Sequence, residues 1–322
     1  GWSPAGNELA GRRGAVQIDG GRARLREKKT RRKNRKKKKV TLRKLDTTWR
    51  EPKALIIFEF DERGKMVNKE RQPLIDGTLL GPDNLAELVA FHLHRLGVAQ
   101  ADLVVFISDG ARWIWDRLAW IEQRAGLDSC KTVHVLDFCH AAHHISLALA
   151  ALGLTGNARK KAYIRMRKLL RQSRYGEVVS ELNKRAKRKK MQADHDVWTE
   201  IRYLKQHGSE GHLQYVTYRR RGIPCGSGAI ESTIRRVINL RLNSNAIYWL
   251  EENAEAIFAI RALILCERWE DTLSRVRHTM ACDRRINWRW TAPDLTKLNA
   301  DETVSPPSPQ PLEKQQLQTT AV

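Results

Sequence analysis

The sequence predicts an α/β fold built on a mixed β-sheet, and three observations support this prediction. Apolar runs of strand length alternate with helical patterns in the first part of the chain. The run at 103–107 is continuously apolar, which is typical of a strand covered on both faces. From His140 to about Gln206 the chain reads as helical and strongly basic, and strands are no longer readable. The first strands can pair as a meander, whereas the later ones need crossover helices.

The strands are marked by apolar runs that stop at polar or turn-forming residues. The run at 54–60, for example, is stopped by Asp61, Glu62, Arg63 and Gly64. In chain order we expect strands at 15–19, at 54–60, a weaker third one starting at 65–67, then at 103–107 and at 133–136.

The helices are predicted from apolar residues at helical spacing. In the first helix we expect Asp83 to be the cap and Gly97 the end. A Trp-rich helix then runs to about Arg124, and after the basic helical block two more helices cover roughly 229–242 and 250–268. This order of strands and helices is that of an RNase H-like core.

The chain is divided by changes in composition. We expect a lead-in at 1–13 whose upstream part is missing, a core at 14–139 with a basic loop at 22–45, a basic helical block at 140–224, C-terminal helices at 225–270 that complete the core, and a tail at 271–322. The tail is rich in Pro, Gln, Ser and Thr from about residue 301, and we expect disorder from there.

The charge balance predicts a polyanionic partner. Lys and Arg number 59 against 36 acids, a formal net charge of +23, and such a surplus favours DNA or RNA binding. Ten of the twelve residues at 28–39 are cations. We expect this run to bind phosphate, and the alternative is that it is a solvated loop with no specific role. The cations of this run that we expect to bind phosphate are Lys28, Lys29, Arg31, Arg32, Lys33, Arg35, Lys36, Lys37, Lys38 and Lys39.

The helical block is basic too. Between Arg159 and Lys190, apolar residues recur at helical spacing, so we expect amphipathic helices with a positive outer face.

The five cysteines and the hydropathy indicate the compartment. The cysteines are scattered without a CxxC pair, which argues against a disulfide scaffold and a cysteine-based zinc site and suits a reducing compartment. No apolar run approaches the ~20 residues of a membrane span, so we expect no membrane partner. The expected location is the cytoplasm, associated with the nucleoid through DNA.

Three acids are the candidates for metal-dependent chemistry. Asp19 ends the first strand and Asp109 ends the fourth, and these strands are neighbours in the expected sheet. Glu231 follows a Gly-Ser-Gly turn on a helix that can pack beside the sheet. Carboxylates suit Mg²⁺ or Mn²⁺, and we expect two ions about 3.5–4 Å apart. The alternative is that the strand-end acids only form turns or cap helices.

Other residues near these acids have competing interpretations. Asp137 is the rival for the second acid, although we favour a cap for the His140 segment. His140, His143 and His144 share one helical turn, and we favour polar packing or contact with DNA over metal binding, with a supporting role for His140 beside the active site as the alternative.

The tryptophans of the second helix raise a similar choice. Trp113 and Trp120 lie seven residues apart on one face, which favours the core over base stacking, and Trp115 is left open.

Several blocks resemble bacterial Mutator-like transposases of the ISKra group. The similar segments are Val16–Arg22 (VQIDGGR) with Trp49–Lys53 (WREPK), Ile107–Trp115 (ISDGARWIW), Leu136–Ala141 (LDFCHA), and Gly226–Ser232 (GSGAIES) with Arg235, Arg236 and Asn239–Leu242 (NLRL). One such block would be weak, whereas four in the family's order over roughly 14–270 are specific. The chain departs from the family at Cys139, where an aromatic residue is usual, and we expect this to change packing rather than metal binding.

The resemblance implies a DDE transposase. It implies an RNase H-like fold with an all-helical insertion between the second and third acids, and it maps the acids onto Asp19, Asp109 and Glu231, as catalytic residues and metal ligands. The same block supplies Arg235, Arg236 and Arg241 as expected DNA contacts.

The expected reaction is metal-dependent cleavage at the ends of an insertion sequence, followed by strand transfer into target DNA. We expect a homo-oligomer on the DNA. The alternatives are a structure-selective nuclease on the same fold and a non-catalytic nucleic-acid-binding derivative of a transposase.

Overall fold

A computed structural model describes residues 2, 4–26, 47–67, 72–243 and 247–287. The basic run at 28–39 and the tail from 301 therefore lie outside the described residues. Residues 1–273 form one compact unit and residues 274–322 a second one.

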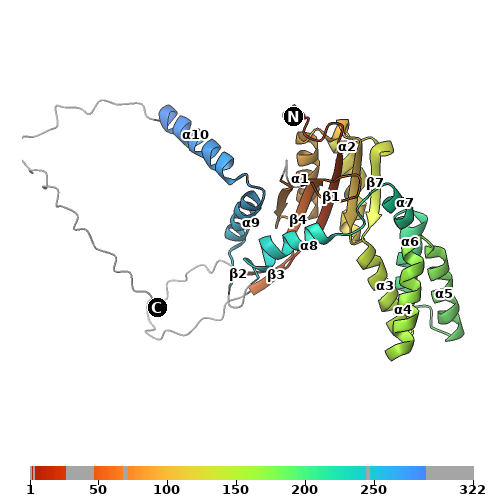
Figure 1. The fold of residues 1–322 in the computed structure, drawn as a ribbon. Coiled ribbons are helices and arrows are strands. Elements are labelled where there is room, and N and C mark those ends of the chain that lie inside the picture. Colours follow the sequence, from red (N-terminus) through yellow and green to blue (C-terminus); the bar gives the residue numbers. More distant parts are fainter. Residues whose placement is uncertain (1, 3, 27–46, 68–71, 244–246, 288–322) are drawn as a thin grey trace, which may run out of the picture. The chain divides into compact units, whose positions relative to one another are not determined.

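The described strands form one mixed sheet and one small ribbon (Figure 1). The strands are β1 Arg13–Gly20, β2 Ala23–Arg26, β3 Thr47–Arg50, β4 Lys53–Glu59, β5 Leu74–Thr78, β6 Leu103–Ser108 and β7 Thr132–Leu136. The sheet has the order β5-β4-β1-β6-β7, with β5, β4 and β1 antiparallel and β1, β6 and β7 parallel. The fold is therefore α/β, and this mixed sheet is compatible with the RNase H-like core that the sequence predicts.

The central pair of the sheet agrees with expectation. β1 runs parallel to β6, with Gln17 opposite Ile107. The predicted neighbourhood of the first and fourth strands is thus confirmed. The reason lies in the apolar pattern, since both strands are buried on both faces and must occupy the middle of the sheet.

The third strand was placed wrongly by the sequence. Residues 65–67 form only an isolated bridge, between Met66 and Phe60, and the third strand of the sheet is β5. The turn at Gly64, with φ of 75°, folds 65–67 back onto the end of β4, so the segment closes a tight turn and does not extend the sheet.

A second difference concerns the loop predicted at 22–45. Its start is β2, which pairs antiparallel with β3 in a two-stranded ribbon, and residues 27–45 lie outside the description.

The helices are described over the same ranges of the chain. They are α1 Pro82–Arg95, α2 Arg112–Ala125, α3 Phe138–Ala151, α4 Gly156–Arg171, α5 Tyr175–Arg188, α6 Asp196–Ser209, α7 Tyr215–Arg220, α8 Gly228–Ile234, α9 Glu251–Leu265 and α10 Trp269–Asn287, with the short turns η1 Val98–Gln100, η2 Ser129–Lys131 and the π-helical η3 Arg235–Asn239. α1 begins at Pro82 after Gly81, so Asp83 lies in the first turn and is not the predicted cap.

Helices cover both faces of the sheet. Val16 and Ile18 of β1 pack with α1 and α2 in one core. Ala15, on the opposite face of the same strand, belongs to the core that contains α8, η3 and α9. This alternation follows from the two-residue period of a strand, and it puts Gln17 and Asp19 on the α8 face.

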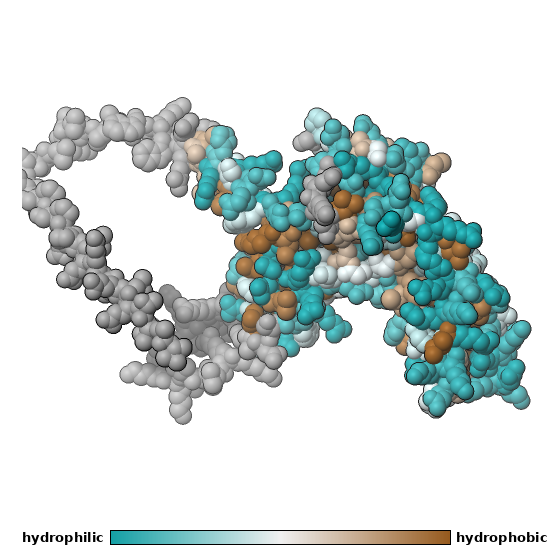
Figure 2. All heavy atoms as spheres, in the orientation of Figure 1, coloured by the Kyte–Doolittle hydropathy of each residue, from teal (hydrophilic) through white to brown (hydrophobic). Residues whose placement is uncertain are grey.

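The helices between β7 and α8 form a packed group of their own. α3 contacts α4 and α6, and α5 packs on α6. In α4 the buried residues Ala162, Met166 and Leu170 recur every four positions, which confirms the predicted amphipathic pattern. Hydrophilic residues dominate the visible surface of this group (Figure 2).

No described helix combines the length and the apolar character that a membrane crossing requires.

Candidate functional site

The two strand-end acids are brought to the same place. Asp19 is the seventh residue of β1, and Asp109 directly follows β6. The parallel register pairs Gln17 with Ile107, so, continued along both chains, it puts Asp19 level with Asp109. The alternation of both strands then directs the two side chains to the α8 face.

Glu231 approaches from that face. It lies in the first turn of α8, a helix that contacts β1 and β4 (Figure 1). Its Oε1 accepts a hydrogen bond from Ser227 Oγ at 3.0 Å, and the residue is exposed. Burial is the main cause of the raised pKa of Asp19, and the negative charge of Glu231 adds a smaller contribution.

The turn before α8 is held from two sides. The buried Gln17 donates from Nε2 to the Gly226 carbonyl at 2.9 Å and accepts from Ile230 N–H at 3.0 Å. Ser227 N–H donates to Asp137 Oδ2 at 2.7 Å. The position of Glu231 therefore depends on β1 and on the start of α3 as well as on its own helix.

Asp137 is the N-cap of α3, as the cap interpretation predicts. It is 1% exposed, and its Oδ1 accepts the His140 N–H at 2.7 Å. Burial opposes ionisation, but hydrogen bonds from His140 and Ser227 outweigh it and lower the pKa of Asp137. In the same pair, the hydrogen bond to Asp137 raises the pKa of His140 despite burial.

Asp109 is positioned by a tight turn. Its Oδ1 accepts the Ala111 N–H at 3.0 Å, and Gly110 follows with φ of 81°. A Cβ at Gly110 would lie 2.1 Å from Tyr203 Oη, so only glycine fits there. That hydroxyl donates to the Asp109 carbonyl at 2.8 Å, which ties α6 to the end of β6.

The acids form a net negative cluster in a basic chain. Burial raises the pKa of Asp19 to about 6, the Gly20 N–H and His140 oppose the rise, and Asp109 and Glu231 add to it. Among the described side chains that shift the pKa of Asp19, the imidazole of His140 thus stands against the two carboxylates of Asp109 and Glu231. The oxygens of Asp19, Asp109 and Glu231 are not all within 4.8 Å of one another in the described structure.

We expect Asp19→Asn to stabilise the metal-free protein, in a pH-dependent way. The folded pKa of about 6 exceeds the usual 3.8, so the native state holds the Asp19 proton more tightly, and this stabilisation is lost as pH rises through 6. With EDTA present, the free energy of unfolding of the variant should exceed that of the wild type by about 1–2 kcal/mol at pH 7.5, a value reduced for the partial exposure of Asp19. At pH 4 the difference should be close to zero. Urea unfolding at both pH values measures this.

The exposed Asp102→Asn is the control and should show no such gain. A gain for Asp19→Asn at pH 4 that vanishes at pH 7.5 would contradict the expectation.

The expected DNA contacts are placed only in part. Arg235, Arg236 and Arg241 are exposed on η3 and just after it. The ten cations of 28–39 lie outside the described residues. A further pair stands on the β2–β3 ribbon, where the guanidinium of the half-buried Arg24 lies 4.7 Å from the ring centre of the exposed Trp49.

The histidines of α3 have separate surroundings. His144 Nδ1 is 2.5 Å from Glu200 Oε2 and its ring stacks on Tyr203, whereas His143 is exposed. This agrees with the preference for polar packing over metal binding. Cys139 is exposed as well.

The tryptophan expectation was wrong for one residue. Trp120 is 43% exposed, whereas Trp113 is partly buried beside Lys53. Trp115, which the sequence left open, packs against both cores. The seven-residue spacing failed because α2 buries a narrow stripe, Ile114, Leu118, Ile121 and Ala125, which passes beside Trp120.

No family model, curated protein or solved structure matches the chain.

Sequence reasoning missed the residues that support the acids. Gln17, Ser227 and Tyr203 contact partners far away in the chain. One signal was available for Gln17, because a polar residue inside a strand buried on both faces needs a hydrogen-bond partner.

Proposed function

We propose that the chain is a DDE transposase with an RNase H-like core, in which the helices α3–α7 are an insertion between the second and third acids. The observation that carries the proposal is the convergence of Asp19, Asp109 and Glu231 on one face of the sheet, with the pKa of Asp19 raised by burial and by the other two charges. The resemblance of the blocks around these acids to Mutator-like transposases supports it.

The residues fit a divalent cation. Three carboxylates, Asp137, Asp109 and Asp19, raise the pKa of His140, and the charge of Glu231 acts on Asp19. No hydrogen bond within the described residues reaches Oδ2 of Asp19 or of Asp109, which leaves these oxygens as ligands. An all-oxygen set suits Mg²⁺ or Mn²⁺. When bound, two such ions would supply charge stabilisation to the attacking and leaving oxygens.

The protein's own part is to hold these oxygens in place. Gln17 and Asp137 keep the turn before α8 rigid, and Ser227 Oγ orients Glu231. Tyr203 holds the backbone of Asp109. The hydrogen bond to Asp137 raises the pKa of His140 and so favours its cationic form, which opposes the negative charge of the acids. No nucleophilic side chain is needed, because water and then a DNA 3′-hydroxyl attack the phosphodiesters.

Exposed cations near the site support DNA as the substrate. Arg235 and Arg236 begin η3, about one turn after Glu231, and a π-helical turn of this kind is frequent at functional sites. The ribbon adds Arg24 beside the exposed Trp49, a pair that can contact phosphate and stack on an unpaired base.

The test is an assay with the chain and DNA carrying the ends of its own element. Cleavage that leaves 3′-hydroxyl ends and joins them to target DNA, with Mg²⁺ and not with EDTA, is the expected result. Hydrolysis without strand transfer would favour a nuclease on the same fold. DNA binding without any metal-dependent cleavage would favour a non-catalytic derivative.

Replacing the Lys and Arg residues of 28–39 by Gln should weaken DNA binding for all sequences alike. Each DNA phosphate that the variant no longer neutralises should remove about 0.9 from the slope of log affinity against log salt. Fluorescence anisotropy at several salt concentrations measures the slope. If the slope does not change, this run does not bind DNA.

A further inference from the structure

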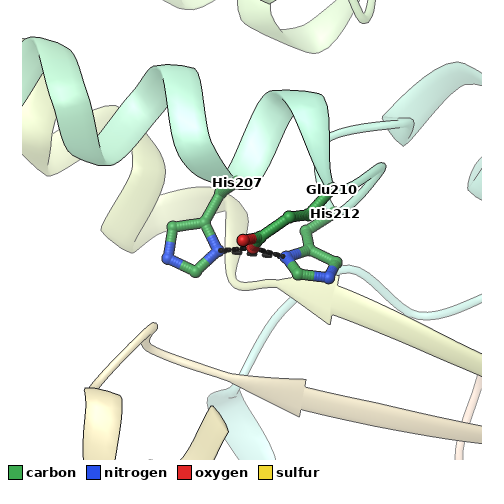
Figure 3. A group of neighbouring side chains, drawn as sticks. All are labelled: His207, Glu210 and His212. Atoms are coloured by element: carbon green, nitrogen blue, oxygen red, sulfur yellow. Dashed lines mark hydrogen bonds and ion pairs between the residues drawn. The ribbon is translucent and has the colours of Figure 1, made fainter. Parts of the chain in front are cut away.

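A second cluster of ligand atoms lies away from the carboxylates. His207 at the end of α6, Glu210 and His212 direct their side chains to one point (Figure 3). Their ligand atoms all lie within 4.8 Å of one another, and no other trio of His, Cys, Asp or Glu in the described residues is grouped this closely. The proposed chemistry uses none of the three.

The local chain geometry makes this approach rigid. α6 ends at Ser209, and Gly211 reverses the chain with φ of 85°. The His212 N–H then donates to the His207 carbonyl at 2.9 Å, and the Gly211 N–H to the Gly208 carbonyl at 3.2 Å, as in a Schellman motif. The two histidines are therefore brought together by the helix end itself.

The distances match a tetrahedral ion. His207 Nδ1 and His212 Nδ1 are 3.0 Å apart, and Glu210 Oε2 lies 3.4 Å from the second and 4.0 Å from the first. A zinc ion with ligands at roughly 2.0–2.1 Å separates tetrahedral ligand atoms by about 3.3 Å. Changes of up to about 0.7 Å in these separations, the largest between His207 and Glu210, would thus bring all three atoms into coordination.

The chemical type of the ligands agrees. His207 and His212 are both buried, and imidazole nitrogens with a carboxylate oxygen are common zinc ligands. Imidazole with one carboxylate favours Zn²⁺ over Mg²⁺. Glu210 is exposed and leaves a path for the ion and for a water as fourth ligand.

The surroundings hold the rings in place. The ring centre of Trp115 lies 4.2 Å from the ring centre of His212 and 4.9 Å from that of His207. The His212 carbonyl accepts the Leu136 N–H at 3.2 Å, which joins this turn to the end of β7. His134 stands nearby but is paired with Glu122.

We propose that His207, Glu210 and His212 bind a zinc ion that fixes the turn after α6. This site is separate from the carboxylate site and does not rest on the proposed function. Its connection to that site is through Tyr203, one turn earlier on α6, which holds Asp109.

The experiment titrates Zn²⁺ into the full chain after treatment with EDTA, and Co²⁺ in parallel. We expect one Zn²⁺ bound by this site, and a Co²⁺ absorption of tetrahedral intensity. His207→Ala should lower zinc affinity by at least about 100-fold, because loss of a direct ligand exceeds the effect of an outer partner. Glu210→Gln, at an exposed position that tolerates change, should lower it by at least about tenfold.

Two controls locate the ion. His143→Ala removes an exposed imidazole elsewhere and should leave zinc binding unchanged. Asp109→Asn alters the carboxylate site and should leave the tetrahedral Co²⁺ spectrum intact, whether or not the chain is a transposase. Zinc affinity that is unchanged in both His207→Ala and Glu210→Gln, or a tetrahedral spectrum lost in Asp109→Asn, would overturn the proposal. So would a folded wild-type chain that binds no zinc.

Discussion

Asp109→Asn is expected to lower the rates of metal-dependent DNA cleavage and strand transfer about a thousandfold or more. Loss of a metal ligand removes several kcal/mol of transition-state stabilisation, and about 1.4 kcal/mol corresponds to a tenfold change in rate. The fold should survive, since Asn Oδ1 can still accept the Ala111 N–H that Asp109 accepts at 3.0 Å. DNA affinity should stay the same or rise, because a negative charge near phosphate is removed. Gel assays of cleavage, with anisotropy for binding and circular dichroism for the fold, separate the three effects.

Asp116→Asn is the matched control for this variant. Asp116 is exposed on α2, and its ion pair with Arg112 is long, at 3.9 Å. Its replacement should leave cleavage nearly intact. Retained cleavage in Asp109→Asn with Mg²⁺, or cleavage lost together with the fold, would contradict the assignment of Asp109 as a ligand.

Asp137→Ala is expected to destabilise the protein by about 2–4 kcal/mol, because it removes a helix cap and leaves buried donors without partners. The side chain joins two parts of the site, accepting the His140 N–H at 2.7 Å and the Ser227 N–H at 2.7 Å. Its loss should also lower cleavage, since the turn that carries Glu231 is no longer held. Urea unfolding gives the stability change.

Asp128→Ala tests whether burial is the cause. Asp128 also caps a short helix, accepting the Cys130 N–H at 2.9 Å, but this bond is exposed to solvent. Water can replace it, so the cost should stay below about 1 kcal/mol. An equal loss in the free energy of unfolding for Asp137→Ala and Asp128→Ala would show that the hydrogen bond from the Ser227 N–H to Asp137 does not stabilise the protein.

The proximity of Asp19 and Asp109 could be predicted because both acids stand near strand ends. Asp19 and Asp109 each follow an apolar run, and the predicted strand order makes these runs neighbours in the sheet, as the structure confirms. Glu231 was reached through the Gly-Ser-Gly turn before it and the resemblance of that block. Its hydrogen bond with Ser227 is local, four residues away.

The supporting residues could not be predicted in the same way. Gln17 bonds to Gly226 across 209 positions of the chain, and Tyr203 to Asp109 across 94. A polar residue in a buried strand shows that a partner exists and does not show which one. The zinc ligands were missed although they lie within six residues, because the helix end that folds His212 back onto His207 depends on the φ of Gly211.

The sequence by itself determined the α/β class, the central pair of strands, the amphipathic helices and the charge, since all of these follow from local periodicity and composition. Only the tertiary structure decided that β5 and not 65–67 is the third strand, that Trp115 and not Trp120 is packed, and that Asp137 ties α3 to the turn before α8. The physical reason is that strand pairing and side-chain burial depend on which elements pack against each other in the folded chain. A local pattern is compatible with several strand pairings and several buried helix faces of similar energy.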